Sequence, residues 1–306
     1  MEYSALFSRG WGITWRNKWM WLLAFIPAVA GLVTFGFSAG QQGMMAGGVA
    51  YGTGAVLLLS CLRFIVAFLI FLIGLATRGG LIAAVDGVDR GESYSFGRAL
   101  GDGRRKVRPL LGMSLLLFGG FGILVALGIA LIVAGSFFAG LTGEMLGSNG
   151  TFGLIDVLAT LGFCCLAVFI GLVAIVLNLI YPFAYRGIML RDMGVRESIR
   201  HGWKVLRENL GEIVLLAVPF FLLGALLAGL YSVVALGGSV TAILSGDPAA
   251  AMNAFSWRFI VLYVIWSLIY AVLLAWQSAT FTLGYRSWTG KGALEDEDIF
   301  GAAWTP

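Results

Sequence analysis

The sequence is poor in charge: only 12% of its 306 residues are Asp, Glu, Lys or Arg, whereas 59% are hydrophobic. A soluble domain has about 25% charged and 45–50% apolar residues. The composition therefore excludes a soluble enzyme or a nucleic-acid-binding domain as a description of the whole chain. The mean hydropathy of +0.93 indicates a protein whose solvent is a lipid bilayer.

Histidine and cysteine are also scarce. The only histidine is His201, and the three cysteines, Cys61, Cys164 and Cys165, all lie in apolar runs. This set provides neither a disulfide framework nor the spacing of a zinc site. The sequence shows no nucleophile with a base, no paired intramembrane carboxylates and no phosphate-binding loop. We therefore expect no metal, no cofactor and no enzymatic activity.

Long apolar runs are what the chain has in abundance. A membrane-spanning helix needs about 20 predominantly apolar residues. Six runs reach that length, at about 19–38, 54–76, 110–135, 154–184, 212–240 and 257–285. The sequence therefore predicts an all-α, polytopic membrane protein with six transmembrane helices in a single transmembrane domain, 1–306.

The basic residues are distributed unevenly between the connecting segments. The segments 39–53, 136–153 and 241–256 contain no Lys or Arg, whereas 1–18, 77–109, 185–211 and 286–306 contain 18 of the 20. Segments rich in Lys and Arg stay on the cytoplasmic side of a membrane. We expect a multi-pass protein of the cytoplasmic (inner) membrane with both termini in the cytoplasm.

The basic segments resemble one another. Gly10-Trp11 is followed by Asn17, and Gly202-Trp203 is followed by Asn209 at the same spacing. A degenerate copy covers 96–106, and an arginine ends the second, fourth and sixth runs (Arg78, Arg186 and Arg286). These spacings predict an internal repeat of about 100 residues, with units at about 1–78, 79–186 and 187–286 and a cytoplasmic tail at 287–306.

Each predicted unit begins with an amphipathic segment. In 196–210, the apolar residues Val195, Ile199, Trp203, Leu206 and Leu210 fall at helical spacing. A helix with such a stripe and basic residues on its other faces lies in the membrane interface. Each unit is therefore predicted to be an interfacial amphipathic helix followed by a helical hairpin.

The motif before the third run is Ser95-Phe96-Gly97-Arg98-Ala99, continuing to Pro109-Leu110-Leu111. In this motif, in a weaker copy at 197–210 and in the opening 3–11, the chain resembles a loose family of prokaryotic six-span membrane proteins. That family includes the membrane domain of some glycerophosphodiester phosphodiesterases and many uncharacterised relatives. The resemblance implies a fold and a membrane location. The phosphodiesterase domain would follow the last span, where about 20 residues remain, so we expect that activity to be absent.

Arg63 is the first candidate for a functional site because it lies inside the second apolar run. An arginine in the middle of a bilayer costs about 2.5–3.5 kcal/mol on insertion scales, so a compensating group is expected. Asp156 at the outer start of the fourth run is one candidate partner, and an anionic ligand is another. Alternatively, the Arg63 side chain snorkels to the interface.

Two sets of charged residues are candidates for contacts with other molecules. Clustered basic side chains attract anionic lipid headgroups, and the expected contacts on the cytoplasmic face are Arg104, Arg105, Lys106, Arg108, Arg200, Lys204 and Arg207. The acidic and aromatic tail is an expected docking segment for a protein partner and comprises Glu295, Asp296, Glu297, Asp298, Phe300 and Trp304. Topology and solvation are the simpler explanations of both groups, and we expect no nucleic-acid partner.

The few polar groups in the spans favour a non-catalytic integral membrane scaffold or accessory subunit, which packs against lipid and a protein partner or a second copy. The alternative is a lipid or small-solute transporter with a site near Arg63. The second function needs polar groups from several helices to converge on one cavity. An intramembrane enzyme would need a nucleophile beside a base at one depth, and the sequence shows none.

Overall fold

The structure, a computed structural model, describes residues 3–28, 53–123, 125–130, 134, 154–244 and 257–290. Every regular element within these ranges is a helix. The helices are α1 (Tyr3–Arg16), a short helix Trp19–Ala28, α3 (Thr53–Asp89), α4 (Phe96–Arg105), α5 (Val107–Ser114), the π-helix η1 (Leu115–Gly119), α7 (Leu154–Arg191), α8 (Val195–Glu208), α9 (Leu210–Leu244) and α11 (Trp257–Trp288).

Within the described residues, five stretches are long and apolar enough to cross a membrane: Leu57–Asp89, Val107–Ala130, Cys164–Arg191, Leu210–Val233 and Val261–Trp288. The first predicted run appears as the apolar helix Trp19–Ala28, and its remainder lies outside the described residues. The prediction of an all-α multi-pass membrane protein is confirmed at this level.

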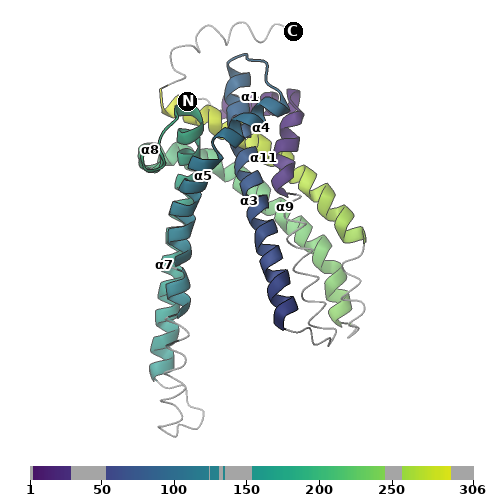
Figure 1. Ribbon diagram of the computed structural model, residues 1–306, viewed down its shortest axis with the longest axis vertical. Coiled ribbons are helices and arrows are strands. Elements are labelled where there is room, and N and C mark those ends of the chain that lie inside the picture. The colour runs from purple at the N-terminus through teal and green to yellow at the C-terminus, as the bar shows by residue number, and fades with distance from the viewer. Residues whose placement is uncertain are drawn as a thin grey trace.

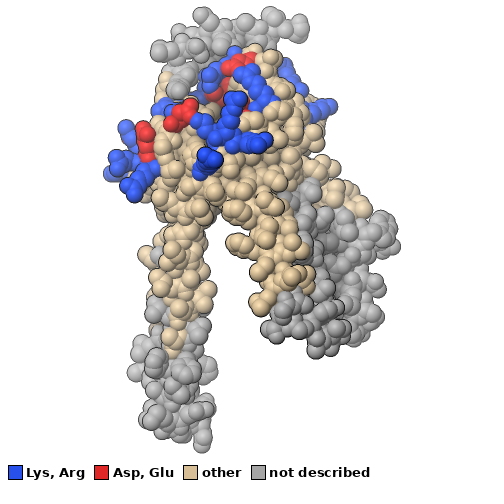
Figure 2. All heavy atoms as spheres, in the orientation of Figure 1, with Lys and Arg blue, Asp and Glu red and all other residues tan. Residues whose placement is uncertain are grey.

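The long helices extend beyond the apolar runs that predicted them. The run 54–76 belongs to α3, which continues to Asp89, and the run 154–184 belongs to α7, which continues to Arg191. Their extensions carry charged residues, and charged side chains gather at this one end of the molecule in Figure 2. Because these ends remain helical, their polar side chains are held at fixed positions between neighbouring helices.

An asparagine marks the junction between two amphipathic helices and the apolar helices that follow them. Asn17 lies between α1 and Trp19–Ala28, and its Nδ2 donates to the Ile13 carbonyl at 2.9 Å. Asn209 lies between α8 and α9, and its Nδ2 donates to the Val205 carbonyl at 3.0 Å. Such side-chain bonds to the i−4 carbonyl compete with the regular helix pattern. The third junction, between α4 and α5, falls at Lys106.

Glycines allow each amphipathic helix to approach a long helix closely. A Cβ at Gly10 of α1 would lie 2.6 Å from Thr280 Oγ1 of α11, and one at Gly202 of α8 would lie 2.8 Å from the Ala184 nitrogen of α7. A Cβ at Gly103 of α4 would overlap the α3 backbone at Ala76. Thus α1 packs on α11, α4 on α3 and α8 on α7.

The packed core lies at the same end as the charged side chains. Its largest buried members include Phe183, Tyr285, Met113 and Leu216, from α7, α11, α5 and α9. Away from this end α7 diverges from α3 (Figure 1), and large side chains such as Phe64 become exposed, here by 73%. In a membrane these diverging helices are covered by lipid chains.

Helix α8 forms where the sequence predicts an amphipathic helix, but the residues of its predicted apolar stripe do not all face the same surroundings. Leu206 is buried, whereas Trp203 is 46% exposed. The face that contacts α7 contains Ser198 and Gly202 instead, because small residues let the two backbones approach. Trp203 is left at the surface, where an indole suits the interface between lipid and water.

Candidate functional site: a cavity with two arginines

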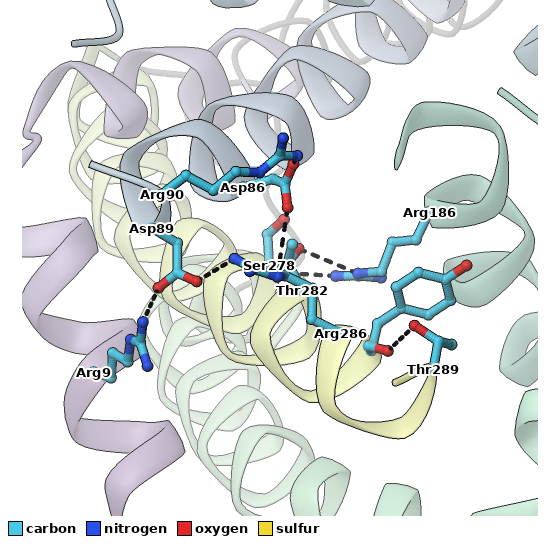
Figure 3. A network of polar contacts seen from close by, with 10 residues as sticks. Arg9, Asp86, Asp89, Arg90, Arg186, Ser278, Thr282, Arg286 and Thr289 are labelled. Atoms are coloured by element: carbon cyan, nitrogen blue, oxygen red, sulfur yellow. Dashed lines mark hydrogen bonds and ion pairs between the residues drawn. The ribbon is translucent and has the colours of Figure 1, made fainter. Parts of the chain in front are cut away.

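A buried ion cluster joins α1, α3 and α11 at the charged end of the molecule (Figure 3). Asp89 of α3 binds Arg9 of α1 at 2.8 Å and also contacts Arg286 of α11. Asp86, one turn earlier in α3, contacts Arg90 and lies 3.7 Å from Arg286. The Asp89 side chain is only 5% exposed. The cluster therefore holds three helices together with charges that have partners of opposite sign.

Arg186 of α7 has a different environment, although it lies close to this ion cluster (Figure 3). It is 4% exposed and donates to Thr282 Oγ1 at 3.2 Å, to the Ser278 carbonyl at 3.1 Å and to the Pro182 carbonyl at 2.9 Å. All these acceptors are neutral, and within the described ranges no carboxylate pairs with Arg186. A buried charge without a counter-charge is costly in a protein interior.

A cavity of about 210 Å³ lies beside Arg186. We call it the arginine cavity. It is lined by Leu23, Ala24 and Pro27 of the first apolar helix, Arg78, Leu81 and Ile82 of α3, Tyr181, Pro182, Tyr185 and Arg186 of α7, and Leu274, Gln277, Ser278 and Phe281 of α11. The described lining residues are mostly apolar, include two arginines and include no acidic residue. A cavity of this kind favours a negatively charged group attached to an apolar one.

Arg78 is the second arginine of the cavity and is exposed. Among the described residues it has neither a hydrogen bond nor an ion pair. It lies one turn from Leu81 and Ile82, which are buried, so the cavity opens on the Arg78 side. A free guanidinium at this opening provides up to five N–H donors in a planar arrangement that suits phosphate or carboxylate.

Tyr185 and Pro182 fix the α7 wall of the cavity. The Tyr185 hydroxyl donates to the Leu75 carbonyl of α3 in a buried hydrogen bond, which ties α7 to α3 next to Arg78. Pro182 lies inside α7 and lacks an N–H, so the regular bond to the Asn178 carbonyl is not made. This proline lines the cavity.

A second, polar pocket of about 280 Å³ lies between α3, α4 and the end of α7. Burial and a hydrogen bond to Asp102 raise the pKa of Tyr94 to about 12. Arg98 stacks on the Tyr94 ring at 4.4 Å and binds Glu92 at 2.8 Å. These charges are mutually paired, so this pocket is a weaker candidate for a ligand site.

The predicted lipid-contacting residues lie on the surface of the charged end. Arg104, Arg105 and Arg108 are exposed, whereas Lys106 is half-buried and pairs with Asp192. On α8, Arg200, Lys204 and Arg207 are exposed, and Lys204 lies 3.9 Å from Glu208. Contact of these residues with anionic lipid stays a prediction.

Arg63, the candidate from the sequence, is exposed on α3 fifteen residues before Arg78. The side chain of Asp156 lies outside the described residues, so their pairing stays a prediction. The tail residues Glu295, Asp296, Glu297, Asp298, Phe300 and Trp304 also lie outside the described residues. The arginine cavity therefore uses a different set of residues from the site that the sequence suggests.

The two arginines of the cavity were visible in the sequence only as the charges that end the second and fourth apolar runs. That signal predicts topology, and Gln277 and Ser278 similarly indicate either helix packing or a cavity. Neither signal shows that Arg78 and Arg186 line one space. The carboxylates of the ion cluster, Asp86 and Asp89, gave no signal because they belong to a segment rich in charge.

His201 provides a prediction about pH. Its Nε2 lies 2.8 Å from the Tyr285 hydroxyl, and burial, followed by the charges of Arg191 and Lys204, lowers its pKa below 6.5, against the opposing effect of Glu197 and Glu208. As the pH falls, the His201 imidazole is therefore protonated in the unfolded chain at a higher pH than in the folded protein, which lowers the free energy of unfolding. We expect thermal stability to decrease from pH 7 to pH 5 more in the wild type than in His201→Gln. Parallel melting curves for the two proteins would contradict this prediction.

Comparison of the chain with protein-family models, curated proteins and solved structures gives no significant match. The fold and its apolar helices define the class, which is that of helical multi-pass membrane proteins.

Proposed function

We propose that the chain binds a negatively charged small molecule within the membrane, in the arginine cavity. The observation that carries this proposal is Arg186, which is buried in the cavity wall and, among the described residues, donates hydrogen bonds only to neutral acceptors. Arg78 adds a second positive charge at the cavity opening. A bound anion would provide the counter-charge that both arginines can share. This function corresponds to the lipid or small-solute transporter, with the site at Arg78 and Arg186 in place of Arg63.

We further propose the six-span topology in the cytoplasmic membrane, with three units and both termini in the cytoplasm. Three observations support it: charged side chains gather at one end (Figure 2), junctions occur at Asn17, Lys106 and Asn209, and an amphipathic helix packs on each of α3, α7 and α11. These junctions are each seven residues after Gly10, Ala99 and Gly202, which are the equivalent positions of the predicted repeat.

The binding function is tested with dodecyl phosphate, an amphiphile with an anionic headgroup, added to the full chain in an uncharged detergent. A hydrogen bond to a charged group contributes about 1.5–3 kcal/mol, which corresponds to tenfold or more in affinity. We therefore expect Arg78→Gln to raise the dissociation constant, measured from thermal stabilisation, at least about tenfold.

Arg196→Gln is the matched control, because Arg196 is exposed on α8 and does not line the cavity. It removes the same charge and should leave the dissociation constant unchanged. An equal loss in both variants, or no stabilisation of the wild type, would contradict the proposal. A loss in Arg63→Gln alone would return the site to the residue that the sequence suggests.

The scaffold or accessory role stays a prediction. It depends on a partner, and none of the described contacts bears on one. A stoichiometric companion protein in gently extracted complexes would support that role, and it would leave the binding test above unaffected.

A further inference from the structure

We infer that the ligand of the arginine cavity is an anionic phospholipid, whose phosphate binds Arg78 and Arg186 and whose acyl chains extend between α3 and α7. This inference rests on the proposed function and names the substrate class of the same site. A soluble anion such as inorganic phosphate has the same charge but no acyl chain.

The route from the charged end of the molecule is filled by side chains. On α3, Asp86 follows the cavity-lining Ile82 by one turn, and on α11 Arg286 follows Phe281. These two charged residues pair with each other, and the Asp86 and Arg286 side chains are only 9% and 14% exposed. Between α3 and α11, access from this end is therefore closed.

Toward the middle of the membrane, beyond the contact between Tyr185 and Leu75, the side chains are apolar and exposed. Residues seven apart lie on nearly the same face of a helix, since seven residues are close to two turns. On α3, Phe71 and Phe64 precede Arg78 by seven and fourteen residues and therefore lie on nearly the same face, where they are 41% and 73% exposed. On α7, Ile175 and Val168 precede Pro182 by the same spacings and are 58% and 63% exposed.

These apolar tracks are long enough to cover the depth of a lipid chain. From Arg78 to Phe64 the chain covers fourteen residues, or about 21 Å at 1.5 Å per residue. One leaflet provides about 15 Å of hydrocarbon. The helices α3 and α7 also diverge away from the charged end (Figure 1), and the space-filling view shows an open gap between them that acyl chains can fill (Figure 2).

The depth of the arginines agrees with a headgroup at this position. Arg186 lies five residues before the end of α7, which is about 7 Å along the helix, and Arg78 lies eleven residues before the end of α3, about 16 Å. Both positions are on the charged side of the protein. A phosphate there is charge-complementary to the cavity, which has two arginines and no acidic lining residue.

The test uses the full chain in nanodiscs with equal amounts of phosphatidylglycerol and phosphatidylcholine of matched chains, analysed by native mass spectrometry. We expect the wild type to retain one phosphatidylglycerol with a preference of about tenfold, as a charge-assisted contact provides. Arg78→Gln should abolish that preference, whereas Arg196→Gln should keep it. Because Arg78 is exposed, its replacement should leave the melting temperature of the protein unchanged.

The chain contact is tested separately with Phe71→Ala. This variant should lower the retention of phosphatidylglycerol by about threefold, because it removes the apolar contact between the Phe71 ring and the acyl chain. Phe221→Ala on α9, where Phe221 is 73% exposed and outside the cavity, is the control and should have no effect.

The outcomes separate the lipid from a soluble anion. One outcome would overturn the phospholipid assignment and leave anion binding intact. In that outcome the wild type shows no lipid preference, and inorganic phosphate stabilises it as much as dodecyl phosphate does, in both cases through Arg78. Failure of phosphatidylglycerol, dodecyl phosphate and inorganic phosphate together would overturn both proposals. Retention of phosphatidylglycerol that is insensitive to Arg78→Gln would place the lipid outside the arginine cavity.

Discussion

Replacement of Gly103 by alanine is expected to lower the free energy of unfolding by about 3 kcal/mol, the upper part of the usual range for overpacking. A Cβ at this position would overlap the Ala76 carbonyl and approach the Gly80 nitrogen, both of which belong to the α3 backbone. Backbone atoms cannot rotate away as a side chain can, so α4 must move off α3. Thermal unfolding of the detergent-solubilised chain measures the change.

Gly101, two residues earlier in α4, provides the matched control. An added Cβ at Gly101 meets no other atom within 4 Å, and alanine favours a helix over glycine by about 0.5–1 kcal/mol. We therefore expect Gly101→Ala to keep or slightly raise the melting temperature. If the two alanine variants melted together, the close packing of α4 on α3 would be wrong.

Replacement of Asp89 by asparagine is the second change with a large expected effect. Breaking a buried ion pair typically costs about 3–5 kcal/mol, because the partner charges remain buried. Asp89 is shared by Arg9 and Arg286, so its loss leaves two guanidinium groups with one fewer carboxylate. We expect a loss of that size in the unfolding free energy, together with easier proteolysis of α1.

An exposed pair serves as the comparison for this effect. Glu92 binds Arg98 at 2.8 Å, but the two side chains are 40% and 51% exposed. Exposed pairs contribute about 0–1 kcal/mol, and salt screens them. Glu92→Gln should therefore change the melting temperature little. A similar loss in both variants would show that the ion cluster contributes no more than a surface pair.

The helices of the protein could be predicted from the sequence because their signals are local. Apolar runs of sufficient length predicted α3, α7, α9 and α11, and the repeated Gly-Trp and Asn motif marked the amphipathic helices. The structure gives the motif a physical basis at Gly202, which contacts α7, and at Asn209, which ends α8. The structural roles of Gly202 and Asn209 depend on residues close in sequence or on one neighbouring helix.

The candidate site could not be predicted because it depends on which helices meet. Hydropathy made Arg63 conspicuous, since a charge within an apolar run is a local anomaly. Arg186 looked ordinary at the end of such a run, although it is 4% exposed and bonded to α11. Its two partners on α11, Ser278 and Thr282, lie more than ninety residues away in the sequence. Contacts between residues so far apart in the sequence can be identified only from the three-dimensional arrangement of the helices.

The packing of α1 on α11 has a consequence for the order of synthesis. Roughly 240 residues separate Asn17 from Trp257, where α11 begins, and translation proceeds at about 5–20 residues per second. The first helix is therefore made roughly 12–48 s before the helix that receives Gly10. Asp89, the partner of Arg9, emerges much earlier. The growing chain thus holds its N-terminal helix by one ion pair first, and the bundle closes only when its last helix arrives.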